Sequence, residues 1–278
     1  HFYAKNVYEV FGTVRSSSKI DKIFSPNEMK YLISGIEAAN FDSLIEAFSA
    51  AKADIVINCI GIIKQSTDAT NCYNSININS FLPHRIAKLC AIDNTRLIHI
   101  GTDCVFDGKT GNYLESDNSN ATDLYGKSKF LGEVDYPHAL TIRTSIIGHE
   151  LFSNVSLVDW FLGKSGSING YTNAFFTGFT TYELAGIIET YVLPNPKLSG
   201  LYHVSADKIS KYDLLKLIAK IYKKDTDIVP NGDIHVDRSL NSDRFRQICS
   251  FKPKSWQDMI DHMHKEFISH TYYQQSSE

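Results

Sequence analysis

The stretch TRLIHIGTDCVF, residues 95–106, decides the fold of this chain. Its first half contains the apolar residues Leu97, Ile98 and Ile100, and it breaks at Gly101, after which Thr102 and Asp103 follow. Such a run is typical of a strand buried on both faces of a parallel sheet. Ligands of open parallel sheets bind beyond the carboxyl ends of the strands. We therefore expect Thr102 to lie at an edge of a sheet where a ligand binds.

Two similar runs predict neighbouring strands, ADIVINCIGII at 53–63 and ALTIRTSIIG at 139–148. Between these runs, apolar residues at helical spacing predict helices at 79–90 and 124–134. A further strand is predicted at 8–14. Strands that alternate with helices indicate an α/β fold with a parallel sheet. After Gly148 the pattern loosens into a segment rich in aromatic residues, glycine and asparagine, followed by three more helices.

The composition excludes several classes of protein. The chain has 278 residues with 43% hydrophobic and 21% charged residues, a net charge of −3 and no long basic run, so nucleic acid is not an expected partner. Five scattered cysteines without a CxxC pair favour a reducing, cytoplasmic location. No apolar run approaches the roughly 20 residues that span a bilayer, and no secretory signal is visible, so no membrane partner is expected.

Tyr125 and Lys129 stand four residues apart in LYGKSKFLGEV and therefore share a helix face. A phenol is a poor acid at neutral pH, and a nearby ammonium lowers its pKa. Such a tyrosine can exchange a proton with a carbonyl or alcohol oxygen. Many solvated helices contain this spacing by chance, but here Thr102 and Asn79 are predicted at the same edge of the sheet. This context favours the catalytic interpretation.

Several segments in order along the chain carry a resemblance to a known family: NCIGII (58–63), INSFLP (78–83), GTDCVFDG (101–108), YLE (113–115), YGKSKFLGE (125–133), RTSIIG (143–148) and RSLNS (238–242). The chain resembles the extended short-chain dehydrogenase/reductases, and within them the dTDP-4-dehydrorhamnose reductase-like nucleotide-sugar reductases. The resemblance implies a Rossmann-type, doubly wound parallel sheet with a smaller C-terminal α/β region that binds substrate. The cofactor domain would comprise 1–147 and about 179–200, and the substrate region 148–178 and 201–278.

One element of that family has no counterpart in the sequence. No GxxGxxG turn occurs, although this turn lets the backbone approach a pyrophosphate at a helix N-terminus. The opening residues HFYAKNVYEVFGTVRSS, 1–17, are interpreted as the end of a helix that leads into a strand. We expect about 20 further residues, with the first strand and the glycine loop, to precede them.

The resemblance assigns catalytic roles to four residues. Tyr125 would protonate a ketone oxygen, Thr102 would orient the carbonyl, and Lys129 would hold the nicotinamide ribose and lower the pKa of Tyr125. Asn79 would support a structural water or the helix bend beside Lys129.

The remaining predicted contacts belong to cofactor and substrate. The backbone of Cys59, Ile60 and Gly61 would line the cofactor, and Asp103 and Val105 would face the sugar. Arg238, Asn241 and Ser242 would lie near the nucleotide diphosphate, where the planar fork of an arginine matches phosphate oxygens. Trp160 either belongs to the core of the smaller region or lines the sugar pocket. No metal site is expected, because His262 and His264 do not share a helix face.

The cofactor form is predicted from Arg15 and Ser16, which follow the strand at 8–14. An acidic residue there would bind the ribose 2′-hydroxyl of NAD, whereas an arginine accommodates the 2′-phosphate of NADP. NADP(H) is therefore favoured over NAD(H). The alternative is that Arg15 only solvates a loop.

The function that these features favour is NAD(P)H-dependent reduction of a nucleotide-linked 4-keto-6-deoxy sugar for surface polysaccharide synthesis. Two alternatives stay open. One is a nucleotide-sugar epimerase of the same superfamily. The other is a non-catalytic NADP-binding regulatory subunit, since the β subunit of methionine adenosyltransferase belongs to this superfamily and a fold does not guarantee turnover. The resemblance also implies a helix-mediated homodimer.

Overall fold

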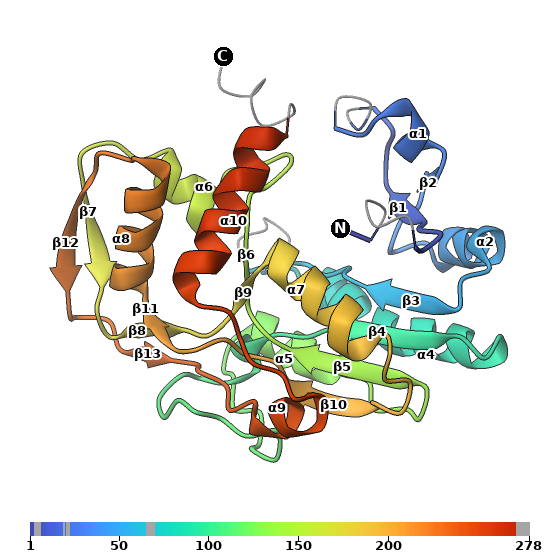
Figure 1. The fold of residues 1–278 in the computed structure, drawn as a ribbon. Helices are drawn as coiled ribbons and strands as arrows, with labels where there is room; N and C mark the ends of the chain where they lie inside the picture. The colour runs from blue at the N-terminus through green and yellow to red at the C-terminus, as the bar shows by residue number, and fades with distance from the viewer. Residues whose placement is uncertain (3–6, 19, 21–22, 65–69, 271–278) are drawn as a thin grey trace.

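A four-stranded, fully parallel sheet in the order β10-β5-β4-β3 forms the centre of the molecule (Figure 1). The computed structural model of the chain describes residues 1–2, 7–18, 20, 23–64 and 70–270. The strands are β3 (Ile55–Asn58), β4 (Arg96–Ile100), β5 (Ala139–Arg143) and β10 (Gly200–His203). The expected α/β fold with a parallel sheet is confirmed.

Helices cover both faces of this sheet, as the alternation of side chains along β4 requires. Leu97 packs with α2 (Phe41–Ala51) and α4 (Leu82–Ile92) on one face. Ile98 packs on the other face with α7 (Thr181–Ile187) and its π-helical continuation η6 (Ile188–Val192). Burial on both sides explains why apolar residues on this strand, Leu97 and Ile98, are adjacent rather than alternating.

A separate parallel pair lies beside the sheet and consists of β1 (Gly12–Val14) and β2 (Leu32–Ser34), with the short helix α1 (Pro26–Met29) between them. Within the described residues, β1 and β2 pair only with each other. The strand predicted over 8–14 is thus shorter than expected, and Tyr8 before it is 38% exposed.

Two predicted boundaries, the end of a strand and the start of a helix, differ from the structure. The strand expected to continue to Ile63 ends at Asn58, whose Oδ1 accepts from the backbone N–H of Ile60 at 3.1 Å. The helix expected at 79–90 begins earlier, as α3 (Cys72–Ser75), and passes through the π-helical turn η4 (Ile76–Phe81) into α4. Side-chain hydrogen bonds from two asparagines, Asn58 and Asn79, replace a continued strand with a turning loop.

The C-terminal half adds short strands and helices around a second core. These elements are β6 (Ile146–Ile147), α6 (Leu157–Leu162), β7 (Ser167–Tyr171), β8 (Ala174–Phe176), β9 (Phe179–Thr180), β11 (Ile209–Ser210), α8 (Lys211–Tyr222), β12 (Asp227–Asn231), β13 (Val236–Asp237), α9 (Asp243–Cys249) and α10 (Trp256–Ser269). Helices α6, α8 and α10 share a cluster that contains Phe161, Ile218 and Ile260. Strand β10 and Phe245 of α9 pack with the central sheet, so that sheet draws residues from beyond position 200.

The amphipathic run SKYDLLKLIAKIYKK, 210–224, predicts a helix capped by Ser210, and this cap of α8 is confirmed, because Ser210 Oγ accepts from the backbone N–H of Asp213 at 3.0 Å. The sequence also predicts a last helix with an apolar stripe of Trp256, Met259, Ile260, Met263 and Phe267, and in α10 Met259, Ile260 and Met263 are buried. In the part of the chain that the structure describes, no helix has both the length and the apolar character needed to cross a bilayer.

Candidate active site

Thr102 lies where β4 ends and the 3₁₀ turn η5 (Asp103–Val105) begins. Its Oγ1 accepts from the backbone N–H of Cys104 at 3.2 Å, which caps the turn. The catalytic helix α5 (Leu124–Leu131) packs directly on this turn. A Cβ at Gly126 would collide with the carbonyl oxygen of Cys104, so glycine at this position permits the close approach. The chain therefore brings Thr102 and Tyr125 together through one turn and one glycine.

Tyr125 is held as a neutral phenol. Burial raises the pKa of Tyr125, negative charge on its neighbours adds to this effect, and a hydrogen bond with the Thr102 hydroxyl opposes it. The expectation that Lys129 lowers the pKa of Tyr125 is not met, because burial dominates and the Lys129 ammonium donates instead to the carbonyl of Ile100 at 3.0 Å. Burial therefore keeps Tyr125 protonated at neutral pH and, by itself, makes it a weaker acid than a free phenol.

Lys129 is a buried cation, with 6% of its surface exposed. Burial lowers its pKa to about 8, while the carboxylate of Glu133 and the thiol of Cys59 oppose this shift. At neutral pH the ammonium therefore remains charged, although its pKa lies only slightly above that pH. A desolvated charge at the edge of a sheet is a frequent mark of a functional site.

The loop after β3 approaches Lys129 through Gly61. A Cβ at Gly61 would lie 3.3 Å from Asn79 Oδ1 and 3.7 Å from Lys129 Nζ. Asn79 fixes this loop, since its Oδ1 accepts from Ile62 N at 2.8 Å and its Nδ2 donates to Ile62 O at 3.1 Å. Nδ2 also lies 3.2 Å from Ser128 Oγ on α5. Asn79 thus joins the predicted cofactor loop to the catalytic helix, and the predicted helix bend is the π-helical turn that contains it.

Asp103 and Arg238 are the next pair at the site. Burial raises the pKa of Asp103, whereas hydrogen bonds, the one to Ser145 above all, and the charge of Arg238 lower it. Arg238 Nε donates to Phe106 O at 2.8 Å. Val105, in contrast, is fully buried in a cluster with Phe106 and lies away from solvent.

The other predicted residues lie further from this centre. Asn241 Oδ1 accepts from Asp243 N at 2.9 Å at the start of α9, and Ser242 Oγ lies 2.9 Å from Ser205 Oγ in the interior. Trp160 on α6 is 37% exposed, with the ammonium of Lys164 5.5 Å from its ring, so it does not belong to the core.

The predicted residues for the cofactor ribose, Arg15 and Ser16, directly follow β1 and are exposed. The neighbouring loop after β3 leaves Cys59 and Gly61 exposed and Ile60 partly buried. The two segments therefore present backbone and side chains at the carboxyl ends of β1 and β3.

One polar network beside the site was missed by the sequence analysis. Arg143 at the end of β5 donates from Nε to Glu133 Oε1 at 2.6 Å and from an Nη to Oε2 at 2.7 Å. Its other Nη donates to His203 Nε2 at 3.1 Å. Glu133 follows Lys129 by four residues, as Lys129 follows Tyr125, and that spacing is a sequence signal that could have identified it.

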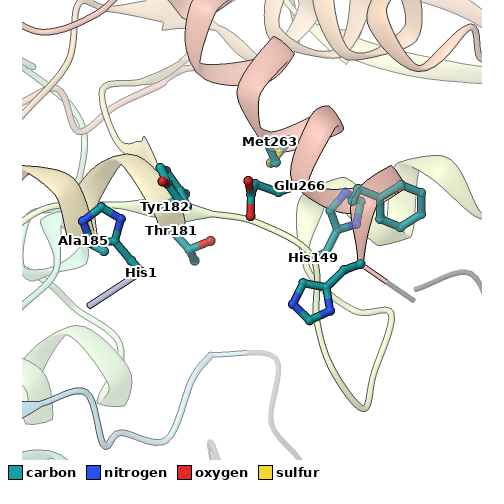
Figure 2. Close-up of a pocket in the computed structure, with 9 residues that line it drawn as sticks. His1, His149, Thr181, Tyr182, Ala185, Met263 and Glu266 are labelled. Atoms are coloured by element: carbon teal, nitrogen blue, oxygen red, sulfur yellow. The ribbon is translucent and has the colours of Figure 1, made fainter. Parts of the chain in front are cut away.

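The pocket in Figure 2, about 270 Å³ in volume, contains none of the predicted catalytic residues. It lies between α7, α10 and the segment after β6, and is lined by His1, His149, Thr181, Tyr182, Ala185, Met263, Glu266, Phe267 and His270. His149 in its wall bonds through Nδ1 to Asp159 at 2.6 Å and through Nε2 to the Tyr222 hydroxyl at 2.8 Å. This pocket is therefore distinct from the candidate active site.

His262 and His264 point to different partners, as expected for residues two apart on a helix. The ring of His262 lies 4.1 Å from Tyr182, and the ring of His264 lies 4.4 Å from Tyr222. Among the described residues, no three histidine, cysteine or acidic side chains form a group suited to a metal ion.

The parallel sheet, with Thr102, Tyr125 and Lys129 at its carboxyl edge, defines a protein of the extended short-chain dehydrogenase/reductase class, which is an oxidoreductase class. The chain belongs to the RmlD substrate binding domain family, whose model matches residues 17–269. The family expected from the sequence is thereby confirmed.

Three relatives show the range of names in this family. The chain is 26% identical over 226 residues to the probable low-salt glycan biosynthesis reductase Agl14 of Haloferax volcanii, covering 77% of this chain and 74% of that one. A dTDP-4-dehydrorhamnose reductase of Aggregatibacter actinomycetemcomitans is 25% identical over 191 residues, 65% of either chain. The methionine adenosyltransferase 2 subunit beta of Danio rerio is 26% identical over 203 residues, covering 65% of this chain and 59% of that one. The chain thus spans less than two thirds of the length of the last two.

Two solved structures share the fold. A dTDP-4-dehydrorhamnose reductase of Bacillus anthracis, in complex with NADP, superposes with a TM-score of 0.72 at 17% identity over 93% of this chain and 99% of that one. The Bordetella bronchiseptica enzyme WbmG, in complex with NAD, gives 0.74 at 14% identity over 98% and 89%. These likenesses confirm the Rossmann-like fold.

Proposed function

We propose that the chain is an NAD(P)H-dependent reductase of a nucleotide-linked 4-keto-6-deoxy sugar, with Tyr125 as the proton donor. One observation carries this proposal. The pKa of Tyr125, raised by burial, is also affected by the Thr102 hydroxyl, and the buried ammonium of Lys129 follows one helical turn later on α5, at the carboxyl edge of the sheet. A hydroxyl pair with an adjacent cation suits a ketone oxygen that gains negative charge during reduction.

The residues present fit a nicotinamide cofactor. A Cβ at Gly61 would come within 3.7 Å of Lys129 Nζ and would fill the space between this loop and the ammonium. A glycine at this position leaves that space free for a ribose. A bound dihydronicotinamide supplies a hydride to the ketone carbon. Tyr125 would then deliver its proton to the ketone oxygen, Thr102 would orient that oxygen, and Lys129 would hold the nicotinamide ribose.

NADP(H) is the cofactor form that the proposal favours over NAD(H). It rests on Arg15, which is exposed directly after β1 and has no acidic residue beside it. The Arg15→Asp variant should raise KM for NADPH at least about tenfold, because a carboxylate repels the 2′-phosphate. A variant with unchanged KM for both cofactors would remove Arg15 from this role.

The sugar nucleotide would lie against Asp103 and Arg238. The guanidinium of Arg238 is held by Phe106 O and its charge acts on Asp103, so this first residue of the RSLNS segment joins that segment to the candidate catalytic turn. An arginine fork is suited to diphosphate oxygens. Asn241, Ser242 and Trp160 remain candidates for contacts with the nucleotide or the sugar, and Val105 contributes through its backbone.

The biological setting belongs to the same proposal. Relatives named for glycan and dehydrorhamnose metabolism support a role in surface polysaccharide synthesis. All five cysteines are free, which supports a cytoplasmic location, where thiols stay reduced.

The test is oxidation of NADPH by the full-length protein supplied with dTDP-4-keto-6-deoxyglucose, with and without a 3,5-epimerase. A UDP-linked 4-keto sugar is assayed in parallel. Substrate-dependent oxidation with one nucleotide establishes the reductase and identifies the base. Absence of NADPH binding would contradict the proposal.

A second candidate is a non-catalytic regulatory subunit, and the similarity to methionine adenosyltransferase 2 subunit beta favours it. The intact set of Thr102, Tyr125 and Lys129 argues for turnover instead. Tight NADPH binding without oxidation on either nucleotide sugar, together with co-purification of a catalytic partner, would favour this second candidate.

A homodimer is also proposed, through the helices that carry the site. Apolar side chains are exposed on α3, η4 and α5, which contact one another: Tyr73 is 78%, Phe81 55% and Leu131 59% exposed. Burying such a face against a second copy would remove it from water. Phe81→Glu should give a monomer by analytical ultracentrifugation, whereas Ile92→Glu, at the far end of α4, should not.

A further inference from the structure

Three ionisable side chains follow one another at intervals of four residues along the catalytic helix and the turn after it. Tyr125 and Lys129 lie on α5, and Glu133 lies just beyond its end. Both carboxylate oxygens of Glu133 accept from the guanidinium of Arg143, at 2.6 and 2.7 Å. The side chains of Arg143 and Glu133 are only 2% and 11% exposed. Burial raises the pKa of Glu133, whereas the hydrogen bonds and the charge of Arg143 oppose that rise and favour the ionised carboxylate.

We propose that Glu133 is a positioning residue that acts through Lys129, as the anion that keeps the buried ammonium charged, and that Arg143 holds this anion in place. The inference deepens the proposed reductase function and rests on it for its catalytic meaning. Glu133 touches neither substrate nor cofactor in this account.

The groups that face Lys129 come from three elements, and only Glu133 is an anion at neutral pH. Cys59 lies in the loop after β3; the residue is exposed at the surface, but desolvation of its thiol raises the pKa, so the thiol stays neutral. His99 of β4 is also neutral, because burial and the charge of Lys129 lower its pKa to about 3. Burial lowers the pKa of Lys129 to about 8, and Glu133 is the foremost group opposing that shift.

Arg143 is fixed from several sides, so the carboxylate that it binds is fixed as well. His203 Nε2 accepts from Arg143 at 3.1 Å, and the ring of Phe106 lies 5.1 Å from the guanidinium carbon. His203 Nδ1 in turn donates to Tyr113 O at 3.0 Å. Glu133 is therefore paired directly with Arg143 and acts on Lys129 through space, from four residues further along the chain. Removal of this carboxylate leaves Lys129 with no anion to oppose its desolvation.

The direct test measures the pKa of Lys129 in the full-length protein by NMR of ¹³Cε-labelled lysine, with the resonance assigned by its loss in Lys129→Arg. The Glu133→Gln variant should titrate at least about one pH unit lower than the wild type. Glu133→Asp should recover part of the shift. Glu115→Gln is the matched control, because its carboxylate accepts from His203 N at 2.9 Å and does not act on Lys129. An unchanged pKa in Glu133→Gln overturns the inference.

A second pair of variants covers the case in which Glu133→Gln does not fold. Arg143→Met and the double variant Glu133→Gln/Arg143→Met both lack the buried guanidinium. The pKa of Lys129 should be lower in the double variant than in Arg143→Met by at least about one unit, a tenfold change in the protonation equilibrium. Equal values in the two variants overturn the inference.

The kinetic readout separates this inference from the proposed function. In the wild type the reductase rate should fall above about pH 8, where Lys129 loses its proton. In Glu133→Gln the same decline should begin at lower pH, with activity recovered on acidification. If the wild type has no activity but the pKa of Lys129 still depends on Glu133, the result contradicts the proposed function and supports the electrostatic role of Glu133. If the enzyme is active but the alkaline decline of its rate is the same with and without Glu133, the result contradicts the role of Glu133 and supports the proposed function.

Discussion

The carboxyl edge of the central sheet and the segment around α6 differ in how tightly their functional candidates are held. Lys129, Asn79 and Thr102 are at most 7% exposed, and each makes side-chain hydrogen bonds that fix its position. On the α6 side, Trp160 is 37% and Phe152 is 61% exposed. Chemistry needs fixed geometry, whereas substrate choice is usually carried by exposed segments on a rigid scaffold. The difference predicts that variants at the edge change turnover and variants near α6 change substrate affinity.

The largest effect is expected for Tyr125→Phe. The variant lacks the proton donor but keeps the ring, so kcat should fall by roughly 10²–10⁴-fold while NADPH binding and thermal stability stay unchanged. Steady-state kinetics measure kcat, and fluorescence titration with NADPH measures cofactor binding. A variant that retains most of its turnover would move the acid to another group.

A large effect on stability is expected from His203, which joins the sheet edge to the C-terminal segment. Burial is the main reason that its pKa is lowered from 6.5 to about 4. The folded protein therefore keeps His203 neutral while the unfolded chain takes up a proton below pH 6.5. Its contribution is complete above pH 6.5 and is lost as the pH falls towards 4, by up to about 3 kcal/mol.

Denaturant unfolding at pH 7 and pH 4 tests this point. His203→Gln should be less stable at pH 7 but should lose less stability on acidification than the wild type. His235→Gln, which changes an exposed side chain, is the control and should follow the wild type. Parallel pH curves for wild type and His203→Gln would contradict the account.

A smaller effect is expected at Gly61, which belongs to the tightly held region but has no side chain that could contact the proposed cofactor. The added methyl group of Gly61→Ala would stand 3.3 Å from Asn79 Oδ1, close enough to displace the loop by a few tenths of an ångström. KM for NADPH should rise several-fold, about 1 kcal/mol, with kcat less affected. Gly166→Ala, at a glycine with no neighbouring atom, controls for a general effect of added bulk; its positive φ of 76° makes a modest stability loss the expected result there.

The smallest effect is expected for Trp160→Ala. An exposed aromatic ring that contacts the sugar would raise KM for the nucleotide sugar several-fold and leave kcat and thermal stability unchanged. Lys164→Ala removes the cation near the ring without removing the ring and should have less effect. If both KM and kcat stay at wild-type values, Trp160 has no part in substrate binding.

The sequence predicted the elements that carry a regular pattern. The strand ending at Ile100, the helix from Leu124 and the cap at Ser210 were found because apolar periodicity and capping residues are local properties. The grouping of Thr102, Tyr125 and Lys129 followed from the rule that strands of a parallel sheet end at one edge.

The features that were missed depend on contacts between distant segments. The π-helical turn at Asn79 arises because its side chain binds the backbone of Ile62, and the strand from Ile55 stops early because Asn58 bonds to its own loop. The partner of Glu133, Arg143, is ten residues away at the end of β5, and the pKa of Tyr125 depends on burial and on neighbours from other segments. No periodicity encodes such contacts, so only the folded structure reveals them.

The central claim is that this sheet edge transfers a hydride and a proton to a sugar ketone. The most direct measurement uses NADPH with both hydrogens of nicotinamide C4 replaced by deuterium and a nucleotide-linked 4-keto-6-deoxy sugar, followed by mass spectrometry of the sugar product. The account predicts one deuterium in the product of the wild type, and formation of this product slowed by roughly 10²–10⁴-fold with Tyr125→Phe. A product that carries no deuterium would contradict the account and indicate an epimerase.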